Sequence, residues 1–218
     1  MSDVPRGAIL QRDKETYAIV PKTLMGLVTP DILENIAHVA RKHQIPIIKI
    51  TSAQRFALVG IKPETVEDVW NDLNMEQGKA VELCLHYVQA CPGTAVCRFG
   101  VQNSLGLGQK LDQLLGHMEM PAKAKIGISG CPMCCGESYV RDLGIMGKKS
   151  GWTLIFGGNA GARPRVGDVI AEGLTDEQAL DLTQKCFDYY IAEGKKKERA
   201  SKFIERIGLE EFKKNVLG

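Results

Sequence analysis

Two pairs of closely spaced cysteines constrain the fold of this chain more than any other feature. The first pair is Cys91 and Cys97, and the second is Cys131 and Cys135. Four thiolates suit the ligation of an iron-sulfur cluster or a zinc ion. Each pair fits within one local loop, but the two pairs lie far apart in the sequence. The chain must therefore fold so that the two loops meet, and a bound metal would link them.

Composition and charge exclude several classes of protein. The chain has 218 residues, of which 44% are hydrophobic, enough for one large domain or two small ones. A net charge of +2 gives no general reason to bind nucleic acid. No run of roughly 18 apolar residues could span a membrane, and the first twenty residues lack the apolar stretch of a secretory signal. We expect a cytoplasmic protein that binds neither nucleic acid nor membrane.

The use of cysteine agrees with a reducing compartment. Seven cysteines, an odd number, in a chain without export features argue against a disulfide framework and favour free thiols or metal ligands. Cys84 and Cys186 stand apart from the two pairs. We predict that both pack as small hydrophobic residues in the core.

Hydrophobic periodicity predicts a small α+β unit at the N-terminus. Thr29 and Pro30 are typical of the N-cap and first turn of a helix. Apolar runs indicate strands over residues 18–20, 45–50 and 56–61, and a second helix is predicted over 62–73. This order predicts a ferredoxin-like sandwich for a first domain, residues 1–75.

The rest of the chain has the pattern of a mixed α/β domain followed by helices. For residues 76–172 we predict strands over 81–90 and 121–129, a helix over 103–118, and a hairpin formed by 142–147 and 152–156. For residues 173–218 we predict two helices, 175–193 and 196–216. The predicted fold class of the whole chain is α+β.

Two lysines alternate with apolar residues just before the second cysteine pair. Lys123 and Lys125 should share one face of the strand, where like charges repel unless they are solvated or face an anion. An exposed edge strand is the alternative explanation. Because the strand runs directly into the loop of Cys131, we expect the lysine face to point toward whatever the cysteines hold.

A glycine-rich segment follows the hairpin and contains two arginines. Backbone amides and guanidinium groups in such a segment can bind carboxylates or phosphates, although it could also be a flexible solvent loop. The segment Gly106-Leu-Gly108 lacks the third glycine of a dinucleotide fingerprint, and there is no Walker loop. The chain is therefore not expected to collect electrons from NAD(P)H by itself.

Four separate segments resemble one known family. Residues 91–104, 128–138 and 156–159 look like the signature segments of sirohaem-containing sulfite and nitrite reductases. Residues 49–61 resemble the N-terminal substrate-binding segment of that family, and the match runs in order over roughly residues 15 to 165. Larger relatives carry two tandem copies. The size and the single copy look closest to the small assimilatory-type, low-spin sulfite reductases of sulfate-reducing bacteria.

The resemblance implies two cofactors and a redox reaction. A [4Fe-4S] cluster would be held by Cys91, Cys97, Cys131 and Cys135, and Cys135 would also be the proximal ligand of the sirohaem iron. Sulfite, with nitrite as the alternative substrate, would bind at the opposite face of the sirohaem. Six electrons from an external donor protein such as a ferredoxin would reduce it to sulfide.

The resemblance also implies roles for cationic residues. Arg55, Lys123 and Lys125 lie on segments that match the anion-binding positions of the family, with Arg98 as a further member. The carboxylates of sirohaem would be anchored by the segment that contains Gly157, Gly158, Asn159, Arg163 and Arg165. Two other classes remain open: a non-catalytic haem and iron-sulfur electron carrier, and a binding module stabilised by zinc, for which Cys131 and Cys134 offer a competing spacing.

Overall fold

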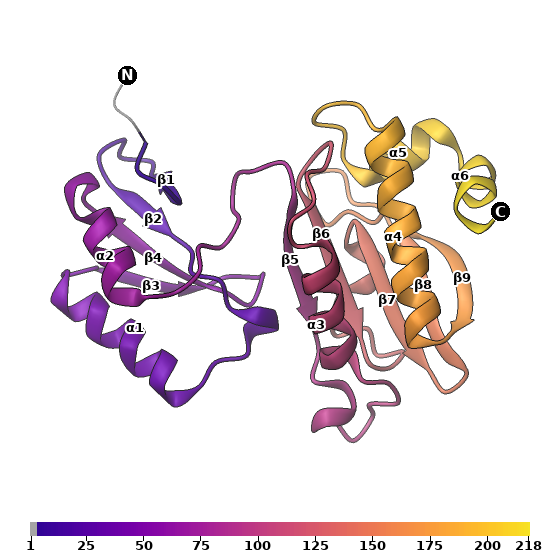
Figure 1. The fold of residues 1–218 in the computed structure, drawn as a ribbon, viewed down its shortest axis with the longest axis horizontal. Coiled ribbons are helices and arrows are strands. Elements are labelled where there is room, and N and C mark those ends of the chain that lie inside the picture. The colour runs from indigo at the N-terminus through magenta and orange to yellow at the C-terminus, as the bar shows by residue number, and fades with distance from the viewer. Residues whose placement is uncertain (1–3) are drawn as a thin grey trace. The chain divides into compact units, whose positions relative to one another are not determined.

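The computed structural model describes residues 4–218, shown in Figure 1. The chain divides into two compact units, Met1–Val81 and Glu82–Gly218. Among the described residues, no helix is both long enough and apolar enough to cross a membrane.

The first unit is an antiparallel four-stranded sheet with two α-helices. The strands are β1 (Ala8–Leu10), β2 (Tyr17–Ile19), β3 (Ile47–Ile50) and β4 (Phe56–Ile61), in the order β1-β2-β4-β3. The helices are α1 (Pro30–Lys42) and α2 (Val66–Leu73), with short 3₁₀ turns at Leu24–Gly26 and Pro63–Thr65. Residues from both helices and the sheet form one core, in which Ile19, Val39, Leu58 and Val69 are fully buried. The predicted ferredoxin-like α+β arrangement is confirmed.

The ends of α1 follow from local chemistry. The Thr29 hydroxyl accepts the Ile32 N–H at 3.3 Å, and Pro30 occupies the first turn, as predicted. At the other end, the His43 ring lies 2.5 Å from an Asp72 oxygen, which ties α1 to α2. Strand β1 was not predicted, because three residues carry too little periodicity to be recognised.

The second unit contains a mixed five-stranded sheet whose strands lie in chain order. They are β5 (Leu85–Ala90), β6 (Ala124–Ser129), β7 (Leu143–Lys148), β8 (Gly151–Phe156) and β9 (Asp168–Leu174). Strands β5, β6 and β7 run parallel, whereas β8 and β9 add antiparallel pairs. The predicted hairpin is confirmed as β7 and β8, and β9 was not predicted. Because β5 and β6 are parallel neighbours, both cysteine loops begin at the same edge of the sheet.

Helices complete the second unit. They are α3 (Ser104–Leu115), α4 (Asp176–Glu193), α5 (Ala200–Ile207) and α6 (Leu209–Leu217), with 3₁₀ turns at Gly93–Ala95 and Ser138–Val140. Phe156 of β8 stacks on Phe212 of α6 with ring centroids 4.6 Å apart, and contacts Phe187 and Tyr190 of α4 edge-on. Cys84 and Cys186 are both buried, as predicted, and burial raises the pKa of the Cys186 thiol. The helices after residue 172 therefore belong to the core of this unit.

The prediction of one helix over residues 196–216 is wrong. The segment forms two helices, α5 and α6, which meet at Gly208. Gly208 has φ of 88° and ψ of 144°, a conformation that is accessible essentially only to glycine. The helix over 175–193 is confirmed, since Thr175 and Gln178 form a reciprocal capping box at its start.

Candidate functional site

The two cysteine loops meet where β5 and β6 end. The Cys91 N–H donates to the Ile128 carbonyl at 3.1 Å, and the Gly130 N–H lies 3.1 Å from the Cys91 sulfur. The N–H groups of Val101 and Gln102 both donate to the Gly130 carbonyl, at 2.9 and 3.0 Å. Hydrogen bonds therefore join the backbone of the first loop to the residue that precedes Cys131.

Glycine permits this close approach of two backbones. A Cβ atom on Gly130 would lie 2.6 Å from the Gly93 Cα atom, and one on Gly100 would lie 2.4 Å from the Gly93 carbonyl carbon. Gly93 itself has a φ of +53°. Side chains at these positions would push the loops apart. Three glycines, Gly93, Gly100 and Gly130, thus allow the backbone between Cys91 and Cys131 to pack this closely.

The three cysteines of the second loop differ in exposure. Cys131 is buried and Cys134 is half-buried, whereas Cys135 is exposed. Cys134 has a φ of +58°, and its N–H lies 3.3 Å from the Cys131 carbonyl. Within residues 4–218, no group of three or more His, Cys, Asp or Glu side chains is arranged to hold a metal ion. The structure brings the two loops together and leaves the Cys135 thiol open to a large ligand.

Apolar side chains project from both cysteine loops into solvent. Val96, Phe99 and Met133 are 81, 54 and 70% exposed, respectively. Exposed apolar side chains around a binding site are typical of surfaces that a ligand or partner covers. The two loops therefore carry thiols together with apolar side chains that a bound ligand could cover.

After Cys135 the chain folds back over β6. The Gly136 N–H donates to the Ser129 hydroxyl at 3.0 Å, and a Cβ on Gly136 would lie 2.1 Å from the Ile128 carbonyl oxygen. The Ser138 hydroxyl lies 2.9 Å from that of Ser129 and donates to the Ile145 carbonyl, also at 2.9 Å. By the alternation of a strand, Ser129 shares its face of β6 with Lys125. The residues after Cys135 thus cover the sheet face on which Lys125 lies.

Lys125 lies half-buried beside an aromatic ring. Its Nζ is 5.8 Å from the centre of the Tyr87 ring, and the guanidinium of Arg141 is 5.9 Å from the same centre. Burial lowers the pKa of Lys125 below the usual value for lysine, and the charge of Arg199 lowers it further, whereas Asp142 opposes the shift. Lys123 is exposed and precedes the first residue of β6, so only Lys125 lies within the strand.

The buried carboxylate of Asp142 accepts hydrogen bonds from both Arg199 and the backbone of Lys125. Asp142 is 1% exposed, and Arg199 donates to it from Nε at 3.0 Å and from Nη2 at 2.8 Å. The backbone N–H of Lys125 donates to the same carboxylate at 3.0 Å. Burial raises the pKa of Asp142, and the charge and hydrogen bonds of Arg199 oppose that shift. This ion pair connects the start of α5 to both β6 and β7.

Arg141 is a second buried charge on this face. Its Nη2 donates to the Gln89 side chain at 2.9 Å and forms an ion pair with Glu137. Its Nε is buried and has no hydrogen-bond partner among the described residues. Arg141, Asp142 and Arg199 were not predicted as site residues. A signal was present, because Arg141 and Asp142 are adjacent charges that directly precede an apolar strand.

The glycine-rich segment is held by its own polar residues. The Asn159 side chain donates to the Arg163 carbonyl at 2.7 Å, and Arg165 donates to the Gly157 carbonyl at 3.0 Å. Arg165 also pairs with Asp168 at 2.6 Å. Gly157 and Gly158 are buried, whereas Arg163 is exposed. Of the two predicted carboxylate anchors, Arg165 is thus engaged within the segment and Arg163 points to solvent.

The remaining predicted cations lie in different units. Arg55, in the first unit, is 9% exposed and its Nη1 donates to the Lys79 carbonyl at 2.6 Å. Arg98, in the second unit, is exposed, with its guanidinium 4.6 Å from the centre of the Phe99 ring.

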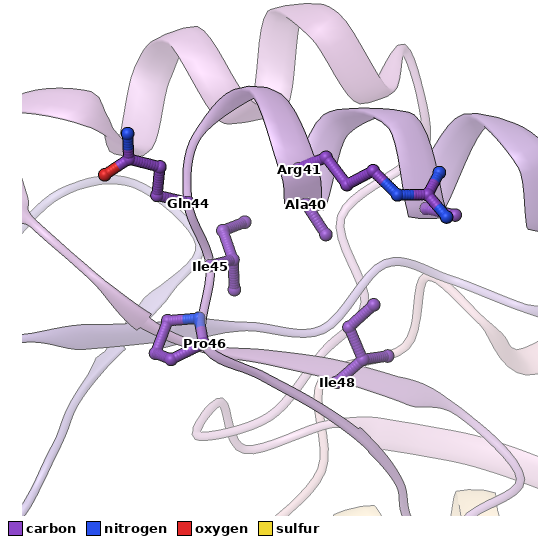
Figure 2. A pocket seen from close by; sticks show the side chains of 7 residues that line it. Ala40, Arg41, Gln44, Ile45, Pro46 and Ile48 are labelled. Carbon is purple, nitrogen blue, oxygen red and sulfur yellow. The ribbon is translucent and has the colours of Figure 1, made fainter.

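The first unit also has a hollow of about 570 Å³ between the end of α1 and β3. Figure 2 shows its lining, which includes Arg41, Gln44, Pro46 and Ile48. Ile48 and its neighbours Ile47 and Ile50 on β3 are exposed apolar residues. No predicted site residue lines this hollow.

Replacement of Gly136 by alanine should destabilise the second unit. The new methyl group would overlap the Ile128 carbonyl, and overpacking of this kind typically costs about 1 to 3 kcal/mol. Denaturant unfolding of Gly136→Ala should show the loss. Gly161→Ala is the control, because its nearest contact would be a side-chain atom at 3.2 Å. Equal stability of the two variants would show that the close packing of Gly136 on β6 does not stabilise the second unit.

Comparison with known proteins identifies both units. Residues 83–218 match the nitrite and sulphite reductase 4Fe-4S domain, and residues 9–76 match the nitrite/sulfite reductase ferredoxin-like half domain. Two solved structures share the fold. One is dissimilatory sulfite reductase I, with a TM-score of 0.82 at 13% identity, covering 92% of this chain and 69% of the other. The second is the NirA protein of Mycobacterium tuberculosis, with a TM-score of 0.81 at 15% identity, covering 93% and 40%.

Two relatives illustrate the range of sequence similarity. The assimilatory-type sulfite reductase of Nitratidesulfovibrio vulgaris is 58% identical over 219 residues, and the alignment covers 100% of both chains. An NAD(P)H nitrite reductase of Bacillus subtilis is 39% identical over 202 residues, which is 93% of this chain and 25% of the relative. On this evidence the chain belongs to the family of nitrite and sulfite reductases, with one ferredoxin-like half domain and one 4Fe-4S domain.

Proposed function

We propose that this protein is an assimilatory-type sulfite reductase that reduces sulfite to sulfide with six electrons from an external donor protein, such as a ferredoxin. The balanced reaction joins SO₃²⁻, six electrons and seven protons to give HS⁻ and three molecules of water. The proposal rests on one observation: the two cysteine loops meet where β5 and β6 end. Lys125 lies on β6, next to this meeting point. The full-length similarity to a sulfite reductase favours sulfite over nitrite.

We propose Cys91, Cys97, Cys131 and Cys135 as the ligands of the [4Fe-4S] cluster, with Cys135 shared with sirohaem. Thiolates are the usual ligands of such clusters. The exposure of Cys135 and the exposed apolar side chains on both cysteine loops support an approach of the macrocycle from solvent. Gly136 contributes by letting the chain after Cys135 pack closely on β6, where a side chain would overlap the Ile128 carbonyl.

When bound, the cluster and sirohaem supply electrons and an iron atom for the sulfur of sulfite. The chain supplies cations for the oxyanion, and we propose Arg55, Arg98, Lys123 and Lys125 for this role. Fixed cations neutralise the charge of the oxyanion and help its oxygens leave as water. Lys125 is also the proposed proton donor, since a half-buried lysine with a lowered pKa releases its proton more readily than an arginine.

The glycine-rich segment is the proposed anchor of the sirohaem carboxylates, through Gly157, Gly158, Asn159, Arg163 and Arg165. The exposed Arg163 supports this role directly. Arg165 would support it by holding the segment in shape, because it already pairs with Asp168. A cytoplasmic location stays a prediction from the use of cysteine.

Purified holoprotein provides the first test of the function. We expect iron, acid-labile sulfide and a visible spectrum with sirohaem bands, and sulfite should oxidise a reduced dye only when the protein is present. NADPH alone should not support the reaction. A colourless protein with zinc would favour the binding module, and a coloured protein without sulfite turnover would favour the electron carrier.

Replacement of single cysteines should separate Cys134 from Cys135. Cys135→Ser should abolish both sulfite reduction and the electronic coupling between haem and cluster, because it removes the proposed shared thiolate. Cys134→Ser should retain both. The measurement is the EPR or Mössbauer spectrum of each variant together with its rate of sulfite reduction. If coupling disappears only in Cys134→Ser, the shared ligand is Cys134 and the proposed assignment is wrong.

Lys125→Ala should lower kcat/KM for sulfite about ten- to a hundredfold, since a charge-assisted hydrogen bond contributes roughly 1.5 to 3 kcal/mol. In the unmodified protein, activity should fall as the pH rises through the lowered pKa of Lys125, because the proton donor is then lost. Lys125→Arg should keep its charge and move this fall to higher pH. Lys149→Ala, which removes an exposed lysine, is the control. Unchanged turnover in Lys125→Ala with intact cofactors would refute the assignment.

A further inference from the structure

A hollow of about 260 Å³ lies between the glycine-rich segment and the start of α5. Its lining includes Asn159, Arg163, Arg199, Ser201, Lys202 and Glu205. All of these residues belong to the second unit, so the hollow is formed within one compact body. The roles proposed above use Arg163 and Asn159 but leave the α5 side of the hollow unassigned.

The charges around this hollow are predominantly positive. Glu205 is the acidic member, and Arg165 pairs with it at 3.4 Å. Arg199 is paired with the buried Asp142. Arg163 and Lys202 are exposed and have no ion-pair partner among the described residues. With the two acids already paired, the charges of Arg163 and Lys202 are available to an anion.

Ser201 provides an independent indication of a ligand. The residue is only 6% exposed, and its hydroxyl has no hydrogen-bond partner among residues 4–218 although it lines the hollow. Its backbone N–H, in the first turn of α5, also has no acceptor there. An unpaired hydroxyl that lines a hollow can donate to a ligand there, and the N-terminal turn of a helix favours negative charge. Both groups would be satisfied by an oxygen acceptor in the hollow.

We propose that this hollow binds a small free oxyanion of the sulfate and phosphate class. Ser201 would donate from its hydroxyl and its N–H, while Lys202 and Arg163 would supply charge. The site uses none of the cysteines and not Lys125, but it shares Asn159 and Arg163 with the proposed anchor of the sirohaem carboxylates, so its test is made on the holoprotein. Its volume of about 260 Å³ is sufficient for such an ion together with bound water.

The test is a titration of the purified holoprotein with sodium sulfate, and separately with sodium phosphate. Sodium chloride keeps the ionic strength constant, and isothermal titration calorimetry and backbone amide NMR shifts of Ser201 report binding. We expect saturable binding with shifts confined to α5 and the glycine-rich segment. Lys202→Ala and Ser201→Ala should each weaken binding about fivefold, and the double variant about twenty-fivefold.

Lys196→Ala is the matched control, since it removes an equally exposed lysine outside the hollow. It should bind like the unmodified protein. Equal weakening in Lys196→Ala and Lys202→Ala, or absence of saturation, would overturn the proposal and leave only non-specific salt effects. Binding that occurs in the cofactor-free protein but not in the holoprotein would also overturn it, because the hollow would then belong to a carboxylate of the cofactor.

Discussion

The parallel pairing of β5 with β6 is the interaction on which the rest of the second unit depends. Because Ala90 lies opposite Ile128, Cys91 and Gly130 leave the sheet side by side. Two hydrogen bonds to the Gly130 carbonyl then fix the first cysteine loop. Parallel strands require a crossover connection, which here is α3, and the buried leucines of that helix hold the pair together. The position of the cysteines is thus determined by sheet geometry as well as by their spacing.

Buried charged residues lie on the face of the sheet next to the two cysteine loops. A carboxylate as buried as that of Asp142 is costly unless it is paired, and Arg199 and the Lys125 N–H satisfy it. The same arrangement places Lys125 near four other charges, those of Arg199, Asp142, Arg141 and Lys123, which together with burial set its pKa. The start of α5 is fixed at the same point, since Arg199 is its N-cap residue. The Asp142–Arg199 ion pair therefore connects the strand that carries Lys125 with the hollow next to Ser201.

The surface around the cysteines carries both exposed apolar residues and cations. The exposed apolar residues Val96, Phe99 and Met133 lie on the cysteine loops, together with the exposed cation Arg98. Further cations lie on β6, at the start of α5 and on the glycine-rich segment. An anionic ligand bound at this surface would be stabilised by such fixed cations.

The sequence by itself determined the elements whose signals are local. The helix start at Thr29 and Pro30, the apolar periodicity and the cysteine spacing each act over a few residues, so the α+β class and the cysteine loops were predictable. Only the tertiary structure decided which distant residues meet. Nothing local links Asp142 to Arg199, or Arg141 to Gln89, because those contacts form when β7 packs beside β6 and α5 returns to the sheet. The short β1, the strand β9 and the break at Gly208 were missed for a related reason: their conformation depends on neighbours or on one backbone angle rather than on periodicity.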